Sequence, residues 1–265
     1  MKIGSGPYAV GLEPLFLVLC ALAAVAYWRA GRHGPVEGRR AWLFAIGVGL
    51  VAGALNSPLE TLAKDYLLLI HLLQNVMLAD WAPPLLILGL TPVMRTALAR
   101  LGGGGRALAF VARPKVALPL WLAVWYAVHL AAFYDFALRN EWALNVEHAL
   151  LLAAGLVFWW PVLAREQGLL STPASIAYLG IAFVTSVFLG LALMFSTTAF
   201  YDYYEAVPRL WGLSAVRDQN LGGLLMNVEQ TLVFLAAIAY FLLRLLGEEE
   251  EAQRAAEAKG RGAAR

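Results

Sequence analysis

Long, almost uninterrupted apolar segments are the feature that most constrains how this chain can fold. A helix that crosses the hydrocarbon core of a bilayer needs about 20 mostly apolar residues. Seven segments meet this requirement, at about 10–28, 41–56, 66–90, 116–134, 143–163, 175–198 and 221–246. They are apolar throughout instead of alternating, which excludes the strands of an outer-membrane barrel. The sequence therefore predicts an all-α membrane protein, a bundle of seven transmembrane helices.

The distribution of charge supports this class and predicts an orientation. Only 14% of the 265 residues are charged, against about a quarter in soluble domains. Of the 20 Lys and Arg residues, all but five lie in alternate loops and in the tail. The five are Lys2, Lys64, Arg139, Arg209 and Arg217. By the positive-inside rule, the N-terminus is outside and the C-terminus is cytoplasmic.

We expect one transmembrane domain, residues 1–246, followed by a charged cytoplasmic tail at 247–265 that continues the last helix into water. The run GGGG at 102–105 lacks the lysine and hydroxyl of a phosphate-binding loop, so we interpret it as a flexible connector. The aromatic loop at 199–220 suits a headgroup-level belt or a short interfacial helix. Basic residues are not clustered into a face, so no nucleic-acid partner is expected.

Ionisable side chains inside membrane spans are costly, and each is a candidate functional residue. His71, His129 and His148 all lie about five residues from the outer end of their predicted spans. The fourth histidine, His33, lies in an inner loop. Asp80 is deeper than the three histidines and near the opposite face of its helix. The sequence thus predicts one polar layer near the outer surface.

Three histidines at one depth suggest a metal site, because imidazole suits copper and a thioether favours Cu(I). The predicted copper ligands are His71, His129, His148 and Met226. The residues predicted to orient these ligands or to carry protons are Glu147, Asn75, Asn145, Glu229, Asp135 and Asp218. For any one of them the alternative is a hydrogen bond that holds two membrane helices together.

Four stretches resemble the signature blocks of a known family. They are HLLQNVMLADWAPPLLILGLTP (71–92), HLAAFYDFAL (129–138), VEHALLLAAGLVFWWPVL (146–163) and DQNLGGLLMN (218–227). The family is that of the multi-span CtaG-type cytochrome c oxidase assembly proteins, associated with caa-type haem–copper oxidases. The resemblance implies a non-enzymatic protein of the bacterial plasma membrane. Its partner would be the copper-containing oxidase subunit, its cargo transiently bound copper, and no haem is expected.

The sequence departs from that family pattern at three positions. The resemblance leads us to expect histidine where Asn75 and Asn145 stand, and tryptophan where Asn227 stands. If the missing histidines bind copper in the family, Met226 or Glu229 would have to substitute for them here. Two other functions stay open: a haem- or quinone-linked redox protein with paired histidines, and a copper or proton transporter.

Overall fold

The computed structural model describes residues 1–99, 102–164 and 169–263. Within them, six helical segments are long and apolar enough to cross a membrane. They are α1 (Pro14–Gly31), α2 (Gly38–Leu55), the compound segment Leu68–Gly89, α10 (Glu141–Leu163), α11 (Thr172–Phe195) and α13 (Ala215–Ala263). The compound segment consists of α4 (Leu68–Val76), the π-helix η1 (Met77–Trp81) and α5 (Ala82–Gly89). These lengths and compositions support an all-α, multi-pass membrane protein.

The fourth predicted span, 116–134, is wrong at its outer end. α8 (Pro114–Val128) ends before His129, and a separate helix, α9, covers Ala131–Arg139. Leu130 between them has an extended backbone, and the Tyr201 hydroxyl donates a hydrogen bond of 3.0 Å to the His129 carbonyl. A side chain from a distant loop therefore stabilises the break. α8 forms a seventh span only if it is joined to α7 (Gly102–Val111), which meets it at 83°.

The GGGG run, predicted to be a flexible connector, is another correction, because residues 102–105 form the first turn of helix α7. α6 (Pro92–Ala99) precedes it, and residues 100–101 between the two helices lie outside the described part. The expected tail helix is present, since α13 continues to Ala263 with an Arg254–Glu250 pair of 3.1 Å one turn apart. Residues 247–259 of the tail are exposed.

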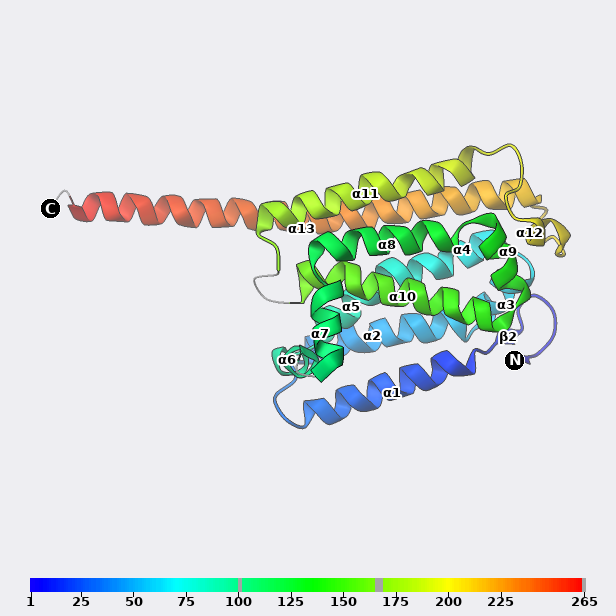
Figure 1. Ribbon diagram of the computed structural model, residues 1–265, viewed down its shortest axis with the longest axis horizontal. Coiled ribbons are helices and arrows are strands. Elements are labelled where there is room, and N and C mark those ends of the chain that lie inside the picture. Colours follow the sequence, from blue (N-terminus) through cyan, green and yellow to red (C-terminus); the bar gives the residue numbers. More distant parts are fainter. Residues whose placement is uncertain (100–101, 165–168, 264–265) are drawn as a thin grey trace.

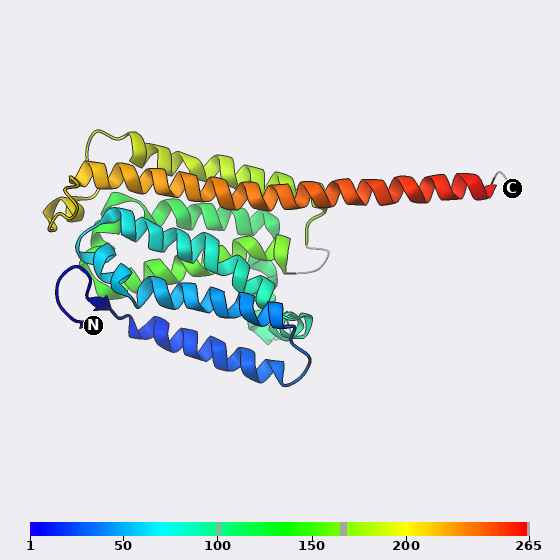
Figure 2. The same ribbon diagram turned by 180° about the vertical axis from the view of Figure 1, so that it is seen from behind.

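The connecting elements gather at the two ends of the bundle (Figures 1 and 2). The N-terminal hairpin of β1 (Lys2–Ile3) and β2 (Val10–Gly11), α3 (Pro58–Asp65), α9 and α12 (Asp202–Ala206) lie together at what we call the hairpin end. α6, α7 and the projecting tail lie at the opposite, tail end. The N-terminal hairpin and the end of α13 are thus at opposite ends of the bundle.

The surface of the bundle is apolar where a bilayer would surround it. In α1, Phe16 is buried, whereas Leu15, Val18, Leu22 and Trp28 are each about half exposed. Water would disfavour such a face, but lipid chains solvate it. This helix therefore supports membrane insertion independently of its hydropathy.

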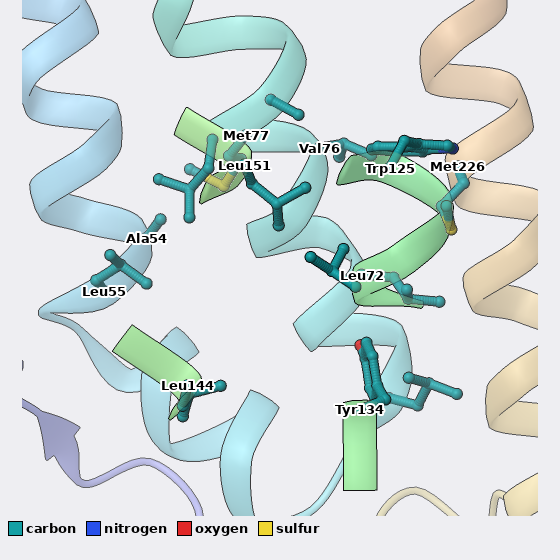
Figure 3. Packing of buried hydrophobic residues seen from close by; sticks show 14 of the residues in the cluster. Ala54, Leu55, Leu72, Val76, Met77, Trp125, Tyr134, Leu144, Leu151 and Met226 are labelled. Carbon is teal, nitrogen blue, oxygen red and sulfur yellow. The ribbon is translucent and has the colours of Figure 1, made fainter. Parts of the chain in front are cut away.

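Two apolar clusters fill the interior. The one nearer the hairpin end contains Leu72, Trp125, Tyr134 and Met226 and is shown in Figure 3. The other is built on stacked aromatic rings, with Trp121 and Phe158 4.5 Å apart between ring centroids. Buried polar residues lie within the first cluster, and they form the candidate site.

Candidate functional site: a buried histidine–carboxylate cluster

Three histidines converge near the hairpin end of the bundle. His71 comes from α4, His129 follows the last residue of α8, and His148 comes from α10. The ring centroids of His71 and His148 are 5.7 Å apart, and the Tyr134 ring lies 4.9 Å from His71 and 5.8 Å from His129. All three histidines are buried. Segments separated by 77 residues in the sequence thus contribute imidazoles to one small region.

Glu147 and Asn75 lie at the centre of this group, and neither is exposed to solvent. The Asn75 amide donates to Glu147 Oε1 at 3.1 Å and lies 3.5 Å from His129 Nε2. His71 Nε2 lies 3.4 Å from the same carboxylate oxygen. We call His71, Asn75, His129, Glu147 and His148 the histidine cluster.

Tyr204 determines which nitrogen of His71 carries a proton. Its hydroxyl donates to the Ala63 carbonyl at 2.6 Å, and His71 Nδ1 lies 3.0 Å from the same hydroxyl oxygen. Because the single hydroxyl proton is already donated to a carbonyl, His71 Nδ1 must be the donor to that oxygen. In a neutral imidazole, Nε2 then carries the lone pair, and it faces the carboxylate of Glu147.

His129 has the same tautomer for a similar reason. Its Nδ1 lies 2.7 Å from the Trp125 carbonyl oxygen, which can only accept a hydrogen bond. Its Nε2 lone pair therefore faces the Asn75 amide. Backbone and hydroxyl partners thus aim the lone pairs of His71 and His129 towards the centre of the cluster, as outer hydrogen bonds do for metal-binding histidines.

Several buried polar atoms in the cluster have no hydrogen-bond partner. They are His71 Nε2, both ring nitrogens of His148, Glu147 Oε2 and Asn75 Oδ1. An unsatisfied buried polar atom costs about 1–3 kcal/mol, and buried polar groups are normally paired. A cation between His71 and Glu147 would satisfy both.

The donor types present fit copper, because imidazole nitrogen and carboxylate oxygen are both metal ligands. Their placement is less complete than their chemistry. Within residues 1–99, 102–164 and 169–263, no group of three or more His, Cys, Asp or Glu side chains is positioned to hold a metal ion. A copper ion would therefore require some side-chain movement in this cluster.

A second buried polar contact, between Gln74 of α4 and Glu60 of α3, lies towards the hairpin end. Gln74, one turn from His71, donates a hydrogen bond of 2.6 Å to the Ala54 carbonyl and one of 2.9 Å to Glu60 Oε2. Burial, opposed by the hydrogen bond from Gln74 and reinforced by Glu13, raises the pKa of Glu60 to about 7. Glu60 is a buried acid of α3, outside the membrane-spanning segments. It was not among the predicted site residues.

Asp135 and Asp218, predicted for the outer rim, bind helix starts. Asp218 accepts hydrogen bonds of 2.9 Å from the backbone N–H groups of Leu68 and Leu69 at the start of α4. Asp135 accepts from Asp202 N at 3.2 Å and Tyr203 N at 3.0 Å at the start of α12. A carboxylate at a helix N-terminus satisfies free donors and the helix dipole. Their contacts are those of structural caps.

Three further predicted residues have partners outside the cluster. Asn145 donates a hydrogen bond of 3.0 Å to the Glu141 carbonyl of its own helix. Met226 is fully buried in the apolar cluster that contains Leu72 and Trp125 (Figure 3). Glu229 accepts a hydrogen bond from Trp81 Nε1, deeper in the bundle.

Tyrosines 134, 201 and 204 complete the site and were missed by the sequence analysis. Tyr201 immediately precedes the short helix α12, and Tyr204 lies within it. Both are buried, so they do not form a headgroup belt. The Tyr134 and Tyr201 rings stack with centroids 4.3 Å apart. The three-residue spacing of Tyr201 and Tyr204 was the available signal, because it places both on one side of a helical turn.

The fold and this site define an all-helical, multi-pass membrane protein with a buried histidine–carboxylate cluster near one end of its bundle. The family model for cytochrome c oxidase caa3 assembly factors (Caa3_CtaG) matches residues 21–248. The chain therefore belongs to the caa3 oxidase assembly factor family, which confirms the predicted family. Its role is accordingly one of oxidase assembly, in association with that oxidase. No curated protein and no solved structure matches the chain significantly.

Proposed function

We propose that this protein assists assembly of a caa3-type oxidase by holding copper in transit to the copper-containing oxidase subunit. The observation that carries the proposal is the approach of His71 Nε2 to Glu147 Oε1 at 3.4 Å. Because His71 Nδ1 donates its proton to the Tyr204 hydroxyl, a neutral His71 would present the lone pair of Nε2 to the Glu147 carboxylate. Two electron-rich groups face each other in this way when a cation binds between them.

The charge of the cluster favours a monovalent ion. Glu147 supplies one negative charge, and the three imidazoles are neutral when they bind a metal. Cu(I) would make the buried group electrically neutral, which lowers the cost of holding it in a low-dielectric interior. The smallest site consistent with the free atoms uses His71 Nε2, a His148 nitrogen and Glu147.

The positive-inside rule supports an outward-facing position. Arg29 and Arg32 lie at the C-terminal end of α1, Arg95 lies in α6, and Arg113 lies between α7 and α8. These segments are at the tail end of the bundle. We therefore infer that the tail end is cytoplasmic and that the hairpin end, with the histidine cluster, faces outward from a bacterial plasma membrane. Copper would enter and leave on that side.

The test is metal analysis of protein purified in detergent after growth with copper. Wild type, a His71→Ala/His148→Ala variant and the control His33→Ala, which alters a histidine outside the cluster, are compared by mass spectrometry and visible spectroscopy. We expect near-stoichiometric copper in wild type and in the control, and none in the double variant. Complementation of a deletion strain reports oxidase assembly in parallel.

Each other outcome identifies a different site. A Soret band in wild type that is lost in the double variant would replace copper with haem. No metal in wild type, together with intact oxidase assembly in the double variant, would overturn the copper proposal. His71 and Glu147 would then be a structural ion pair with a protonated imidazole.

A further inference from the structure

A second buried polar group lies deeper in the bundle, where η1 meets α13. It consists of Asp80, Glu229 and Gln230, which we call the inner acid cluster. Their exposed fractions are 0%, 6% and 1%. Asp80 interacts with both Glu229 and Gln230. Nine residues separate Asp80 from His71 along one span, about 13 Å at the rise of a helix.

Most of the polar atoms in this cluster have no hydrogen-bond partner. Glu229 Oε1 accepts from Trp81 Nε1, and this is the cluster's one satisfied carboxylate oxygen. Both Asp80 oxygens, Glu229 Oε2 and both side-chain polar atoms of Gln230 are unpaired. Four oxygens and one amide nitrogen of these three buried side chains thus lack hydrogen-bond partners.

Asp80 lies within the π-helix η1. Pro83 and Pro84 have no N–H, so the carbonyls of Ala79 and Asp80 lose the donors an α-helix would supply. Ala82 N–H instead bonds to the Met77 carbonyl five residues back. Such an extra residue rotates the preceding turn, and π-helices of this kind occur frequently at functional sites.

Gly155 of α10 makes room for this geometry. A Cβ on Gly155 would collide with the Ala79 carbonyl oxygen and would lie 2.7 Å from Pro83 Cγ. α10 can therefore pack directly against the distorted turn only because residue 155 is glycine. Two independent features, the proline pair and the glycine, thus maintain a conformation that costs helix hydrogen bonds.

Two ionised carboxylates cannot share this environment. None of the ion pairs among the described residues joins Asp80 or Glu229 to a lysine or arginine. Glu229 also borders an apolar groove of about 510 Å³ between α4 and α13 on the outside of the bundle. Uncompensated charge is very unfavourable there, and adjacent like charges repel strongly in a low dielectric.

We propose that the inner acid cluster is a proton-binding site in which Asp80 and Glu229 together retain at least one exchangeable proton at neutral pH. A carboxylic O–H on Asp80 would donate to one of the two unpaired neighbouring oxygens, Glu229 Oε2 or Gln230 Oε1. The Gln230 amide would donate to the remaining oxygen. The titratable groups facing each other here are Asp80 and Glu229, with Trp81 and Gln230 as the neutral polar neighbours. The site is separate from the histidine cluster and does not depend on copper.

The test is infrared difference spectroscopy of the purified full-length protein between about pH 5 and pH 9, in H2O and D2O. Wild type should show a carboxylic acid C=O band near neutral pH that shifts in D2O. Asp80→Asn and Glu229→Gln should each remove or shift it. Glu141→Gln, a change at an exposed carboxylate, should leave it unaltered, and Glu60→Gln identifies the band of the other buried acid.

Isotope labelling keeps the test decisive if a variant does not fold. In wild-type protein with ¹³C at aspartate carboxyl carbons, part of the band should shift; with ¹³C-glutamate, the complementary part should shift. A spectrum in which the only protonated-acid band belongs to Glu60 would overturn the proposal. So would loss of the band on adding sodium at constant pH, which would make the cluster a cation site.

Discussion

The hydroxyl of Tyr204 lies 3.0 Å from His71 Nδ1, although 133 positions separate the two residues in the sequence. Because Tyr204 donates its own proton to the Ala63 carbonyl, this contact places the His71 proton on Nδ1 and directs the Nε2 lone pair to Glu147. The copper proposal depends on this arrangement. Tyr204 is a positioning residue, since it acts through His71.

Tyr204→Phe should weaken copper binding about 10- to 100-fold, the usual effect of losing an outer hydrogen bond to a metal-binding histidine. His71 could then adopt either tautomer. Competition titration with a Cu(I) chelator measures the affinity. Tyr203→Phe is the matched control, because Tyr203 is adjacent and its hydroxyl makes no hydrogen bond to a described histidine. Equal losses in both variants would contradict the positioning role.

Asn75→His should strengthen copper binding by about tenfold or more, because it places an imidazole between Glu147 and His129. Asn145→His should bring no gain, since Asn145 is partly exposed and bonds to its own helix. The same chelator titration compares the two. Each variant adds one histidine at a similar depth in the bundle. A difference between them therefore reports where the imidazole lies and not the number of histidines. A gain from Asn145→His alone would place the site elsewhere.

Glu147→Gln should abolish copper retention while leaving a folded protein. The amide keeps an oxygen that can accept from Asn75, but the negative charge that offsets Cu(I) is lost. Metal content after gel filtration measures retention, and the thermal unfolding midpoint reports folding. Glu141→Gln, which alters an exposed acid at the start of the same helix, is the control. Retention of copper by Glu147→Gln would remove the charge argument.

The pKa of Glu60, about 7 instead of 4.5, makes stability depend on pH. Between those values the folded state holds a proton that the unfolded state has released, so stability falls as pH rises from about 4.5 to 7 and is level above. The loss amounts to about 3 kcal/mol. Glu60→Gln should remove this dependence and be more stable than wild type above pH 7, as measured by thermal unfolding in detergent. If the stabilities of wild type and Glu60→Gln changed with pH in the same way, Glu60 would not be the source of the pH dependence.

Gly155→Ala should destabilise the protein by about 1–3 kcal/mol, because the added methyl group meets the Ala79 carbonyl in a packed interior. Gly180→Ala in α11 is the matched control, since a Cβ there meets nothing within 4 Å. That change should be neutral or stabilising by up to about 1 kcal/mol through helix propensity. Thermal unfolding of both variants tests the difference. If Gly155→Ala were as stable as Gly180→Ala, close packing against η1 would not matter.

Hydropathy was sufficient to predict the all-helical, multi-pass membrane class, because insertion energy is a sum over about 20 consecutive residues. It failed at the fourth span, where the Tyr201 contact to the His129 carbonyl stabilises a break that no local pattern contains. The four sequence blocks also predicted the family, which the match over residues 21–248 confirms.

For the site, the sequence by itself determined that His71, His129 and His148 lie near one depth, since depth follows from counting along a span. Only the tertiary structure decided their neighbours. Tyr204 contacts His71, and Glu229 lies beside Asp80 instead of beside the histidines. The physical reason is that contacts between helices depend on how each helix is rotated about its axis. The π-turn at η1, which the Pro83–Pro84 pair favours locally, and the close approach of Gly155 to Ala79, a contact between distant segments, set that rotation.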